Sequence, residues 1–323
     1  MSTEDENSGD VQTWVTLPGG VFRIGSDAFY PEEGPAHDRQ IEPFTIARAP
    51  VTNREFAEFV AATGHVTVAE RELPAAVFPG LGPDERIPGS TAFTPTAGPV
   101  PLDDWMQWWR WVPGADWRHP LGPDSTVDGK DDHPVVHVAF EDANAFARWA
   151  GLRLPTEAEH EYAASGGVIA APYAWGSERT PDGIVMANTW FGLFPYRNEG
   201  ARGWVGTSPV GSFPPNAFGL VDMIGNVWEW TTDYYISSHA TRASKARDPA
   251  LPAGCTCGPD RTRLTRLAEQ SIAPGESVPR RVLKGGSHLC APEYCLRYRP
   301  PARSPEAEDT STSHIGFRCV RPD

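Results

Sequence analysis

Residues 284–303 read "KGGSHLCAPEYCLRYRPPAR" and carry two of the five cysteines of the chain, Cys290 and Cys295. Their separation of five positions is odd, so a regular strand would place the two thiols on opposite faces. Pro292 lies between them and disfavours a continuous helix. The glycine pair that precedes them permits unusual backbone angles. The stretch therefore favours a loop or bulge, which could bring both sulfurs to one place.

Arginines follow the cysteines in "RYRPPAR", and cationic neighbours lower the pKa of a thiol. Two thiolates with few other ligands favour a soft ion such as Cu(I) over Zn²⁺, which takes four ligands. The chain has no CxxC pair, so a zinc ribbon and a thioredoxin-type dithiol are poor fits. A redox switch, a metal site, a structural crosslink and core packing all stay open at this point. Reactive or metal-binding thiols rank slightly above a structural pair.

The composition predicts one irregular α+β domain with little regular secondary structure. The 323 residues include 31 Gly and 33 Pro, which interrupt long helices, together with 12 Trp and 14 Phe for aromatic clusters. The acidic, polar residues 1–13 are expected to be a disordered tail, and residues 14–323 are expected to form the domain. Cys319 is expected in the core, whereas Cys255 and Cys257 lie in a polar, proline-containing loop.

Three segments carry helix signals. Thr52 and Glu55 form a capping-box pattern in "VTNREFAEFVAATG" (51–64), and "LPTEAEHEYAASGG" (154–167) repeats it with Thr156 and Glu159. The third segment, "EDANAFARWAG" (141–151), ends on a glycine stop. Short strands are expected in five segments rich in β-branched or aromatic residues: "GGVFRIGS" (19–26), "HPVVHVAF" (133–140), "SPVGSF" (208–213), "RRVLKGGS" (280–287) and "IGFRCV" (315–320).

Charge and hydropathy exclude some partners. The formal net charge of −14 argues against nucleic-acid binding, because a phosphate backbone repels such a surface. No window approaches the roughly 20 apolar residues that span a bilayer, so no membrane partner is expected. The start, "MSTEDENSGDVQTW", is the opposite of a secretory signal peptide. A cytoplasmic location is therefore the expectation.

Two further groups of residues invite a functional interpretation. The tryptophans around Trp108 and Trp109 would suit a peptide-binding groove, although core packing is about as good an explanation. In "GNVWEW" (225–230), Asn226 and Glu229 offer the hard oxygen ligands that Ca²⁺ takes, although such residues more often serve local hydrogen bonds. His133 and His137 would share one face of a strand, but ordinary hydrogen-bonded histidines are several times commoner than a two-histidine metal site.

Several stretches of the sequence match the motifs of one known family, in the same order along the chain. They support a more specific prediction than the patterns above. "KGGSHLCAPEYCLRYRPPARS…GFRC", "GNVWEW", "RLPTEAEHEYAASGG" and "HPVVHVAFEDANAFARWAG" strongly resemble the formylglycine-generating enzymes, the sulfatase-modifying factors. "LPGGVFRIGS", "APVTNREFAEFVAATG", "ANTWFGLFP" and "GTSPVGSFPPNAFGL" match as well. The likeness runs from about Trp14 to Arg321. The cysteine pair is its most specific part, because the binding modules and sulfoxide synthases of the wider superfamily usually lack it.

The resemblance implies a formylglycine-generating-enzyme fold, related to C-type lectins, and a monomer. It implies that O₂ oxidises a cysteine, within Cys-x-Pro-x-Arg of an unfolded sulfatase polypeptide, to Cα-formylglycine. By analogy, Cys290 and Cys295 hold Cu(I), and the substrate thiolate joins as a third sulfur ligand. The remaining site residues implied by the family fall into three groups. They are the pocket residues Ser287, Tyr294, Arg297 and Trp228; the substrate-binding residues Trp108, Trp109 and Arg299; and the structural Ca²⁺ ligands Asn226, Val227, Glu229 and Asn188.

This chain departs from the family pattern at several positions. Ala291 and Pro292 follow the first cysteine, where the family commonly has a histidine. Glu306 replaces a usual asparagine, which alters part of the pocket wall. His160 stands in "AEHE" where "AEWE" is usual. Arg202 occupies the position expected to hold a calcium-binding aspartate, so the site at Asn188 is expected to be lost or altered.

Two rival functions differ in class from a formylglycine-generating oxidase. One is a non-catalytic binding protein that holds a partner on the tryptophan-lined surface, for which the paired cysteines would have no use. The other is a nonheme-iron sulfoxide synthase, which would need a histidine cluster that the sequence does not show. The cysteine pair therefore favours the copper oxidase.

Overall fold

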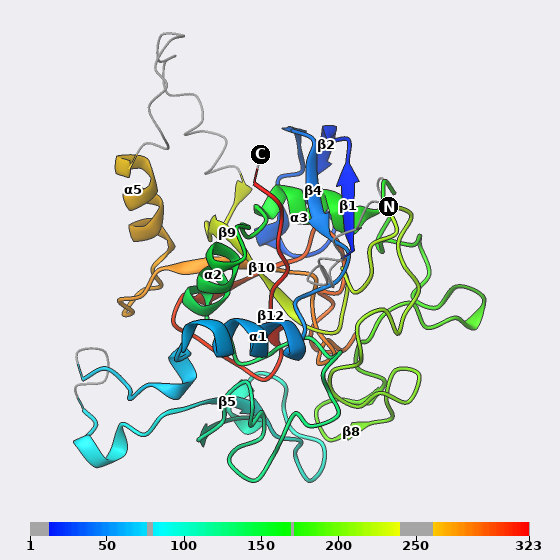
Figure 1. Cartoon of the computed structure of the whole chain (residues 1–323). Helices are drawn as coiled ribbons and strands as arrows, with labels where there is room; N and C mark the ends of the chain where they lie inside the picture. Colours follow the sequence, from blue (N-terminus) through cyan, green and yellow to red (C-terminus); the bar gives the residue numbers. More distant parts are fainter. Residues whose placement is uncertain (1–12, 76–79, 169–170, 240–260, 323) are drawn as a thin grey trace, which may run out of the picture.

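The computed structural model describes residues 13–75, 80–168, 171–239 and 261–322, in which short elements are joined by long irregular segments (Figure 1). Its strands are β1 (Trp14–Leu17), β2 (Gly20–Ile24), β3 (His37–Ile41), β4 (Phe44–Ala47), β5 (Gly89–Phe93), β6 (Trp109–Pro113), β7 (Gly192–Leu193), β8 (Arg197–Asn198), β9 (Trp228–Tyr234), β10 (Arg280–Lys284), β11 (Arg303–Ala307) and β12 (Ile315–Gly316). Its α-helices are α1 (Asn53–Thr63), α2 (Phe140–Trp149), α3 (Glu157–Ser165) and α5 (Arg261–Ser271). Its 3-10 helices are η1 (Pro31–Glu33), η2 (Val68–Glu70), η3 (Pro83–Glu85), η4 (Trp105–Gln107) and η5 (Pro181–Gly183). The mixed α+β class is as predicted.

A four-stranded sheet in the order β11–β10–β9–β12 forms the centre of the fold. β10 runs antiparallel to β11 and β9, and β12 runs parallel to β9. The other strands pair two by two, as β1–β4, β2–β3, β5–β6 and β7–β8. The central sheet thus places the "GNVWEW" strand β9 next to β10, which leads into the cysteine segment.

The capping signals are confirmed. Thr52 and Glu55 form a complete capping box at α1, and Gly64 ends that helix in the left-handed conformation, with φ 68°. Thr156 and Glu159 do the same at α3. The reciprocal side-chain and backbone hydrogen bonds satisfy donors that a helix N-terminus leaves free, so these boundaries follow from local sequence alone.

Two expected strands are absent from the described part of the chain, over 133–140 and 208–213. In the first, His137 has a φ of 58°, which turns the chain out of the extended region. The backbone N–H groups of Val135, His137 and Phe140 donate to three distant carbonyls, those of Val51, Thr312 and Glu308. The alternating hydrophobic pattern here reflects burial among several segments and not pairing in a ladder.

Helix α5 was not expected, because its first residues were assigned to the polar loop. Residues 1–12 of the expected tail lie outside the described residues, and only Thr13 of that segment is described. Cys255 and Cys257 also lie outside the described residues. Cys319 is fully buried, as predicted.

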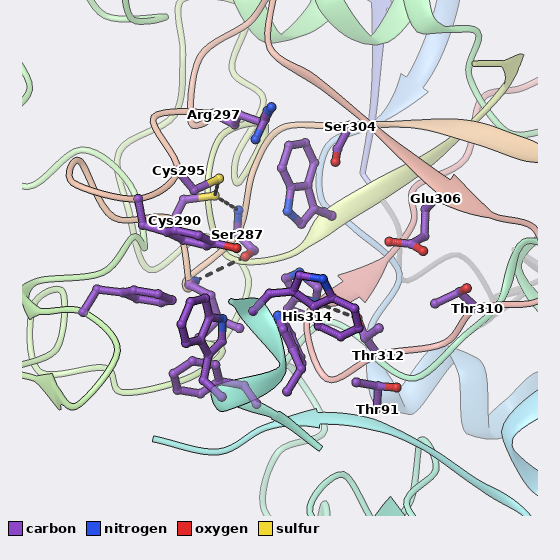
Figure 2. A pocket seen from close by; sticks show the side chains of 18 residues that line it. Thr91, Ser287, Cys290, Cys295, Arg297, Ser304, Glu306, Thr310, Thr312 and His314 are labelled. Carbon is purple, nitrogen blue, oxygen red and sulfur yellow. Dashed lines mark hydrogen bonds between the residues drawn. The ribbon is translucent and has the colours of Figure 1, made fainter. Parts of the chain in front are cut away.

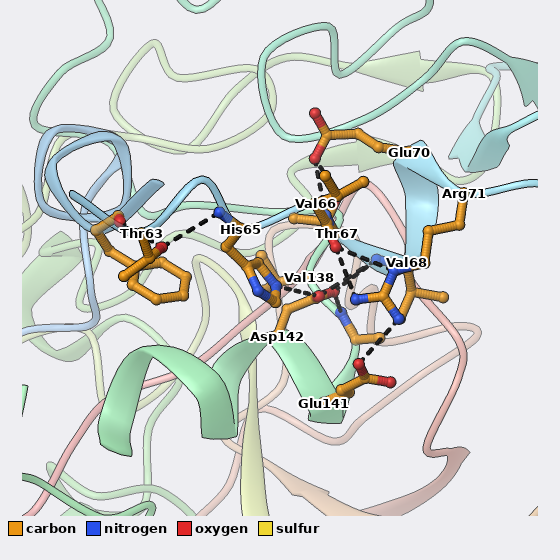
Figure 3. Close-up of polar contacts among 12 residues, drawn as sticks. Thr63, His65, Val66, Thr67, Val68, Glu70, Arg71, Val138, Glu141 and Asp142 are labelled. Atoms are coloured by element: carbon orange, nitrogen blue, oxygen red, sulfur yellow. Dashed lines mark hydrogen bonds and ion pairs between the residues drawn. The ribbon is translucent and has the colours of Figure 1, made fainter. Parts of the chain in front are cut away.

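The segment between α1 and β5 is fixed by a buried carboxylate of α2, Asp142 (Figure 3). It contacts His65 Nε2 at 2.8 Å and accepts hydrogen bonds from the N–H groups of Val68 and Ala139. Arg71 adds an exposed ion pair with Glu141 at 2.9 Å. These contacts hold the chain that leads to β5, and β5 supplies one wall of the site described next.

Candidate functional site

The cysteine segment begins with a glycine turn after β10. Gly285 and Gly286 have φ values of 92° and 74°, in the region that only glycine adopts readily. A Cβ atom on Gly286 would lie 2.9 Å from the Arg297 carbonyl oxygen. The turn therefore packs directly against the backbone that follows Cys295, and a side chain at Gly286 would push the two apart.

The predicted loop between the cysteines is a single helical turn. The N–H groups of Tyr294 and Cys295 both donate to the Ala291 carbonyl, at 3.1 and 2.7 Å. As a result the sulfurs of Cys290 and Cys295 lie 3.3 Å apart, on one side of the chain (Figure 2). Both cysteines are free thiols. The prediction that this stretch brings the two sulfurs together is confirmed.

The two thiols differ in their electrostatic surroundings. Burial raises the pKa of Cys290, which is 2% exposed, well above its ordinary value. The hydrogen bond from the Cys290 thiol lowers the pKa of Cys295 to about 7, against the effect of its own burial, and the positive charge of Arg297 adds to this. The pair therefore favours one thiol and one thiolate at neutral pH, with the negative charge on Cys295.

Arg297 is held beside the thiols by residues that are distant in the sequence. Its Nη2 atom lies 2.6 Å from Glu32 Oε1, and its guanidinium carbon lies 4.2 Å from the centre of the Tyr30 ring. Tyr30 also binds the cysteine segment directly, because its hydroxyl accepts a hydrogen bond from the Leu296 N–H at 3.0 Å. The cation near Cys295 is thus fixed in position by residues around η1.

The thiols lie at one end of a cavity of about 530 Å³. Tyr294 stacks on Phe194 with ring centres 4.7 Å apart, and Trp108 meets both rings edge-on. The cavity is lined by Thr91, Phe93, Trp105, Trp108, Trp109, Phe194, Trp228, Ser287, Leu289, Cys290, Tyr294, Cys295, Arg297, Ser304, Glu306, Thr310, Thr312 and His314. Much of the wall near the thiols is therefore aromatic.

The opposite end of the cavity is polar. Figure 2 shows Ser304, Glu306, Thr310 and Thr312 on the side away from the cysteines. Burial raises the pKa of Glu306 to about 7, more than the hydrogen bonds from Ala307 N–H and the Thr310 side chain lower it. A carboxyl group that titrates near neutral pH therefore faces the cavity.

Most residues expected at the site line this cavity. Ser287, Tyr294, Arg297, Trp228, Trp108 and Trp109 all do so, although their individual roles stay predictions.

Arg299 requires a correction. It is fully buried outside the cavity lining, and both of its terminal nitrogens bind the carboxylate of Glu33 in η1. Its Nε atom donates to the Leu296 carbonyl at 2.7 Å. Direct substrate contact does not fit this arrangement. Instead, Arg299 anchors the cysteine segment to η1, next to the Arg297–Glu32 pair.

The thiol pair fits a copper ion. It offers two soft sulfur donors 3.3 Å apart, one with a lowered pKa, and the described residues hold no group of three or more His, Cys, Asp or Glu side chains that could bind a harder metal. Two thiolates with few competing ligands are the donor set that suits Cu(I).

The "GNVWEW" side chains do not fit a calcium ion in this arrangement. The two oxygens of Glu229 accept hydrogen bonds from Arg318, at 2.6 and 2.7 Å, and one of them also contacts His160 Nε2 at 2.9 Å. Asn226 is equally engaged, because its amide oxygen accepts from the Ser208 N–H and its amide nitrogen donates to the Ser208 carbonyl. Both residues are fully buried, as is Val227.

Asn188 differs from these residues. Its Oδ1 atom is buried without a hydrogen-bond partner, whereas its amide nitrogen donates to the Gly206 carbonyl. Arg202 donates to the Ser212 carbonyl. The calcium site stays a prediction. Of its expected side-chain ligand atoms, only Asn188 Oδ1 is free of hydrogen bonds within the described residues.

The two expected strand histidines serve hydrogen bonds. His133 Nδ1 contacts Thr207, and His137 contacts Ser90 and the Pro120 carbonyl. Burial lowers the pKa of both imidazoles, so the neutral forms are favoured. The structure therefore supports ordinary hydrogen-bonded histidines and not a two-histidine metal site.

Some lining residues had no signal in the sequence. Thr91 and Phe93 in β5 lie some 200 positions from the cysteines, and Phe194 follows a short strand elsewhere. Only the high density of aromatic residues hinted that they would gather around the site.

A family model of the sulfatase-modifying factor enzyme 1-like domain matches residues 2–322. The chain belongs to this family. It is 58% identical over 306 residues to the formylglycine-generating enzyme of Mycobacterium tuberculosis, with 95% of this chain and 96% of the relative covered. It is 41% identical over 318 residues to the inactive C-alpha-formylglycine-generating enzyme 2 of Mus musculus, covering 95% and 84%. The structure of PvdO from Pseudomonas aeruginosa aligns with a TM-score of 0.58 and 25% identity, over 96% of this chain and 94% of that one.

The family therefore includes relatives named as enzymes and relatives named as inactive. Membership fixes the sulfatase-modifying factor fold, as the resemblance implied. Within the described residues, no helix is long and apolar enough to cross a bilayer.

Proposed function

We propose that this protein is a formylglycine-generating oxidase. It oxidises a cysteine, in a Cys-x-Pro-x-Arg sequence of an unfolded sulfatase polypeptide, to Cα-formylglycine with O₂. The observation that carries the proposal is the pair of free thiols, 3.3 Å apart, at one end of a cavity with aromatic walls. The 58% identity to a formylglycine-generating enzyme over nearly the whole chain supports it.

The proposed cofactor is Cu(I), held by Cys290 and Cys295. When bound, copper supplies a site that binds the substrate sulfur and activates O₂ for its oxidation. Calcium is not included in the proposal, because Glu229 and Asn226 already use their side chains for hydrogen bonds within the protein.

The residues of the chain prepare this end of the cavity for thiolate chemistry. The Cys290 hydrogen bond and the charge of Arg297 lower the pKa of Cys295 to about 7, so the thiolate that binds soft metals is well populated near neutral pH. Tyr294 and Trp108, whose rings meet edge-on, add apolar surface to the same cavity. The substrate cysteine loses two electrons and two protons, one proton from Cβ and one from its thiol, and O₂ takes them up as hydrogen peroxide; the product is a thioaldehyde. Water then replaces its sulfur by oxygen and releases hydrogen sulfide.

The proposed setting is the cytoplasm, where the protein acts as a monomer without nucleic-acid or membrane partners. The three free cysteines among the described residues suit a reducing compartment. The net charge of −14 opposes binding to a phosphate backbone.

The alternative of a non-catalytic binding protein draws support from the relative named inactive. A binding protein that uses only aromatic surface would have no need of two adjacent free thiols with a cation fixed beside them. The arrangement around Cys295 therefore favours the oxidase.

Three cysteine variants test the proposal. Cys290→Ser and Cys295→Ser should abolish aldehyde formation on a peptide that contains Cys-Thr-Pro-Ser-Arg, measured by mass spectrometry. Cys319→Ser is the matched control, because Cys319 is buried in the core outside the cavity, and it should retain activity. Circular dichroism checks the fold of each variant. Full activity in folded Cys290→Ser protein would overturn the copper–thiolate proposal.

A further inference from the structure

The end of the cavity opposite the cysteines carries a carboxylate for which the chemistry described so far has no use. Of the lining residues, Glu306 is the one Asp or Glu, and Arg297 at the thiol end is the one Lys or Arg. Arg297 already binds Glu32. The cavity therefore has a cationic end that is neutralised within the protein and an anionic end that is not.

The contacts of Glu306 contrast with those of its neighbour Glu308. Glu306 accepts a hydrogen bond from the Ala307 N–H at 3.3 Å and one from the Thr310 side chain, and it forms no ion pair with any described residue. Glu308, two positions further on, pairs with Arg281 at 2.5 Å. An ionised carboxylate buried without a cation is unfavourable, and it becomes favourable when a ligand brings the cation.

We propose that Glu306 binds the guanidinium group of the arginine in the Cys-x-Pro-x-Arg target and so determines substrate specificity. The inference rests on the proposed function for the identity of the target.

The cysteine and the arginine of the target are close together in its sequence. Arginine lies four residues after cysteine, so the two Cα atoms are at most about 14 Å apart in an extended chain. Ser304 lines the same cavity on the side away from the cysteines, and its hydroxyl offers an acceptor for a further guanidinium N–H group (Figure 2).

Binding can be measured without turnover. The probe is a fluorescently labelled peptide, Ser-Thr-Pro-Ser-Arg with short flanks, in which serine replaces the reactive cysteine. Its partner carries citrulline, which has the shape of arginine but no charge. Fluorescence anisotropy at pH 8 should show that the wild-type protein binds the arginine peptide roughly 10- to 100-fold more tightly than the citrulline peptide. Glu306→Gln should bind both peptides alike.

Glu308→Gln is the matched control, because it removes the same charge two positions away. It should keep the preference for arginine. Equal affinity of the wild-type protein for the two peptides would overturn the inference. So would a Glu306→Gln variant that weakens both peptides by the same factor, which would indicate a hydrogen bond to the peptide backbone.

Failure of the inference and failure of the proposed function give different results. If wild-type protein discriminates between the peptides but never forms aldehyde on the cysteine peptide, the function fails and the arginine subsite stands. If aldehyde forms at equal kcat/KM from the arginine and citrulline versions, the function stands and the subsite fails.

Discussion

The two ends of the cavity are built by different means. At the thiol end, Arg297 and Arg299 on one segment bind Glu32 and Glu33 on another, and this double clamp fixes the turn that holds the sulfurs. At the carboxylate end, Glu306 has hydrogen bonds but no ion pair within the described residues. The comparison suggests that chemistry requires a rigid end, whereas recognition of a charged substrate requires an end that leaves its charge uncompensated.

The comparison predicts that the two ends can be disabled separately, and the thiol end gives the largest effect. Cys295→Ser should lower turnover of the cysteine peptide by about 10³-fold or more, because it removes a copper ligand. The variant should still bind the serine peptide that contains arginine more tightly than the one that contains citrulline. Parallel assays of aldehyde formation and anisotropy check both. Loss of the preference in folded Cys295→Ser protein would show that the ends are not independent.

Breaking the clamp at Arg299 should affect stability first. Arg299→Gln leaves Glu33 as an uncompensated buried charge, which should lower the free energy of unfolding by about 3–5 kcal/mol. Chemical denaturation followed by tryptophan fluorescence measures this loss, and Glu33→Gln should give a loss of similar size. If Arg299→Gln instead unfolds like the wild type and raises KM, Arg299 contacts substrate after all.

Removing the charge of Glu306 should instead raise the free energy of unfolding. Its pKa is about 7 in the folded protein against an ordinary value of 4.5, so the unfolded chain loses the proton first. Wild-type stability should therefore fall as the pH rises from about 4.5 to about 7. The charge of Asp309 adds to the rise in the pKa of Glu306, and the charge of Arg280 opposes it. Glu306→Gln should be up to about 3 kcal/mol more stable at pH 8 and indistinguishable from wild type at pH 4.

Denaturation at the two pH values provides this measurement. Glu308→Gln, which loses its ion pair with Arg281, should be destabilised or unchanged at pH 8. A Glu306→Gln protein that is less stable than wild type at pH 8 would mean that Glu306 already has a favourable partner.

The smallest expected effect concerns the charge of Arg297. In copper-free protein, Arg297→Gln removes the cation that favours the Cys295 thiolate, so the pKa of Cys295 should rise. Alkylation of Cys295 by iodoacetamide at pH 7, mapped by mass spectrometry, should slow by about 10-fold. Cys290 should react little in either protein, because it is buried. An unchanged rate at Cys295 would assign the lowered pKa to the Cys290 hydrogen bond alone.

Local chemistry explains what the sequence could predict. The capping boxes at Thr52 and Thr156 and the loop between Cys290 and Cys295 depend on residues within a few positions of one another. The true role of Arg299 could not be predicted, because its partner Glu33 lies 266 positions away. The segment 133–140 was mistaken for a strand because alternating burial looks the same whether the backbone pairs with one strand or with three separate segments.

The carboxylate end of the cavity could not be predicted from the sequence for a similar reason. Glu306 could be noted as a departure from a family pattern, but its position in the cavity depends on how β11 is brought to the same cavity as β5, which is more than 200 positions earlier. Its raised pKa follows from burial, which one residue in a polar stretch does not reveal.

The most direct test of the account compares the copper-free protein with the protein loaded with one equivalent of Cu(I). Each is mixed aerobically with the Cys-Thr-Pro-Ser-Arg peptide, and the product is identified by mass spectrometry. The account predicts that the copper-loaded protein exchanges the thiol sulfur for an aldehyde oxygen and that the copper-free protein leaves the peptide unchanged. Tight copper binding at Cys290 and Cys295 without any aldehyde would contradict it.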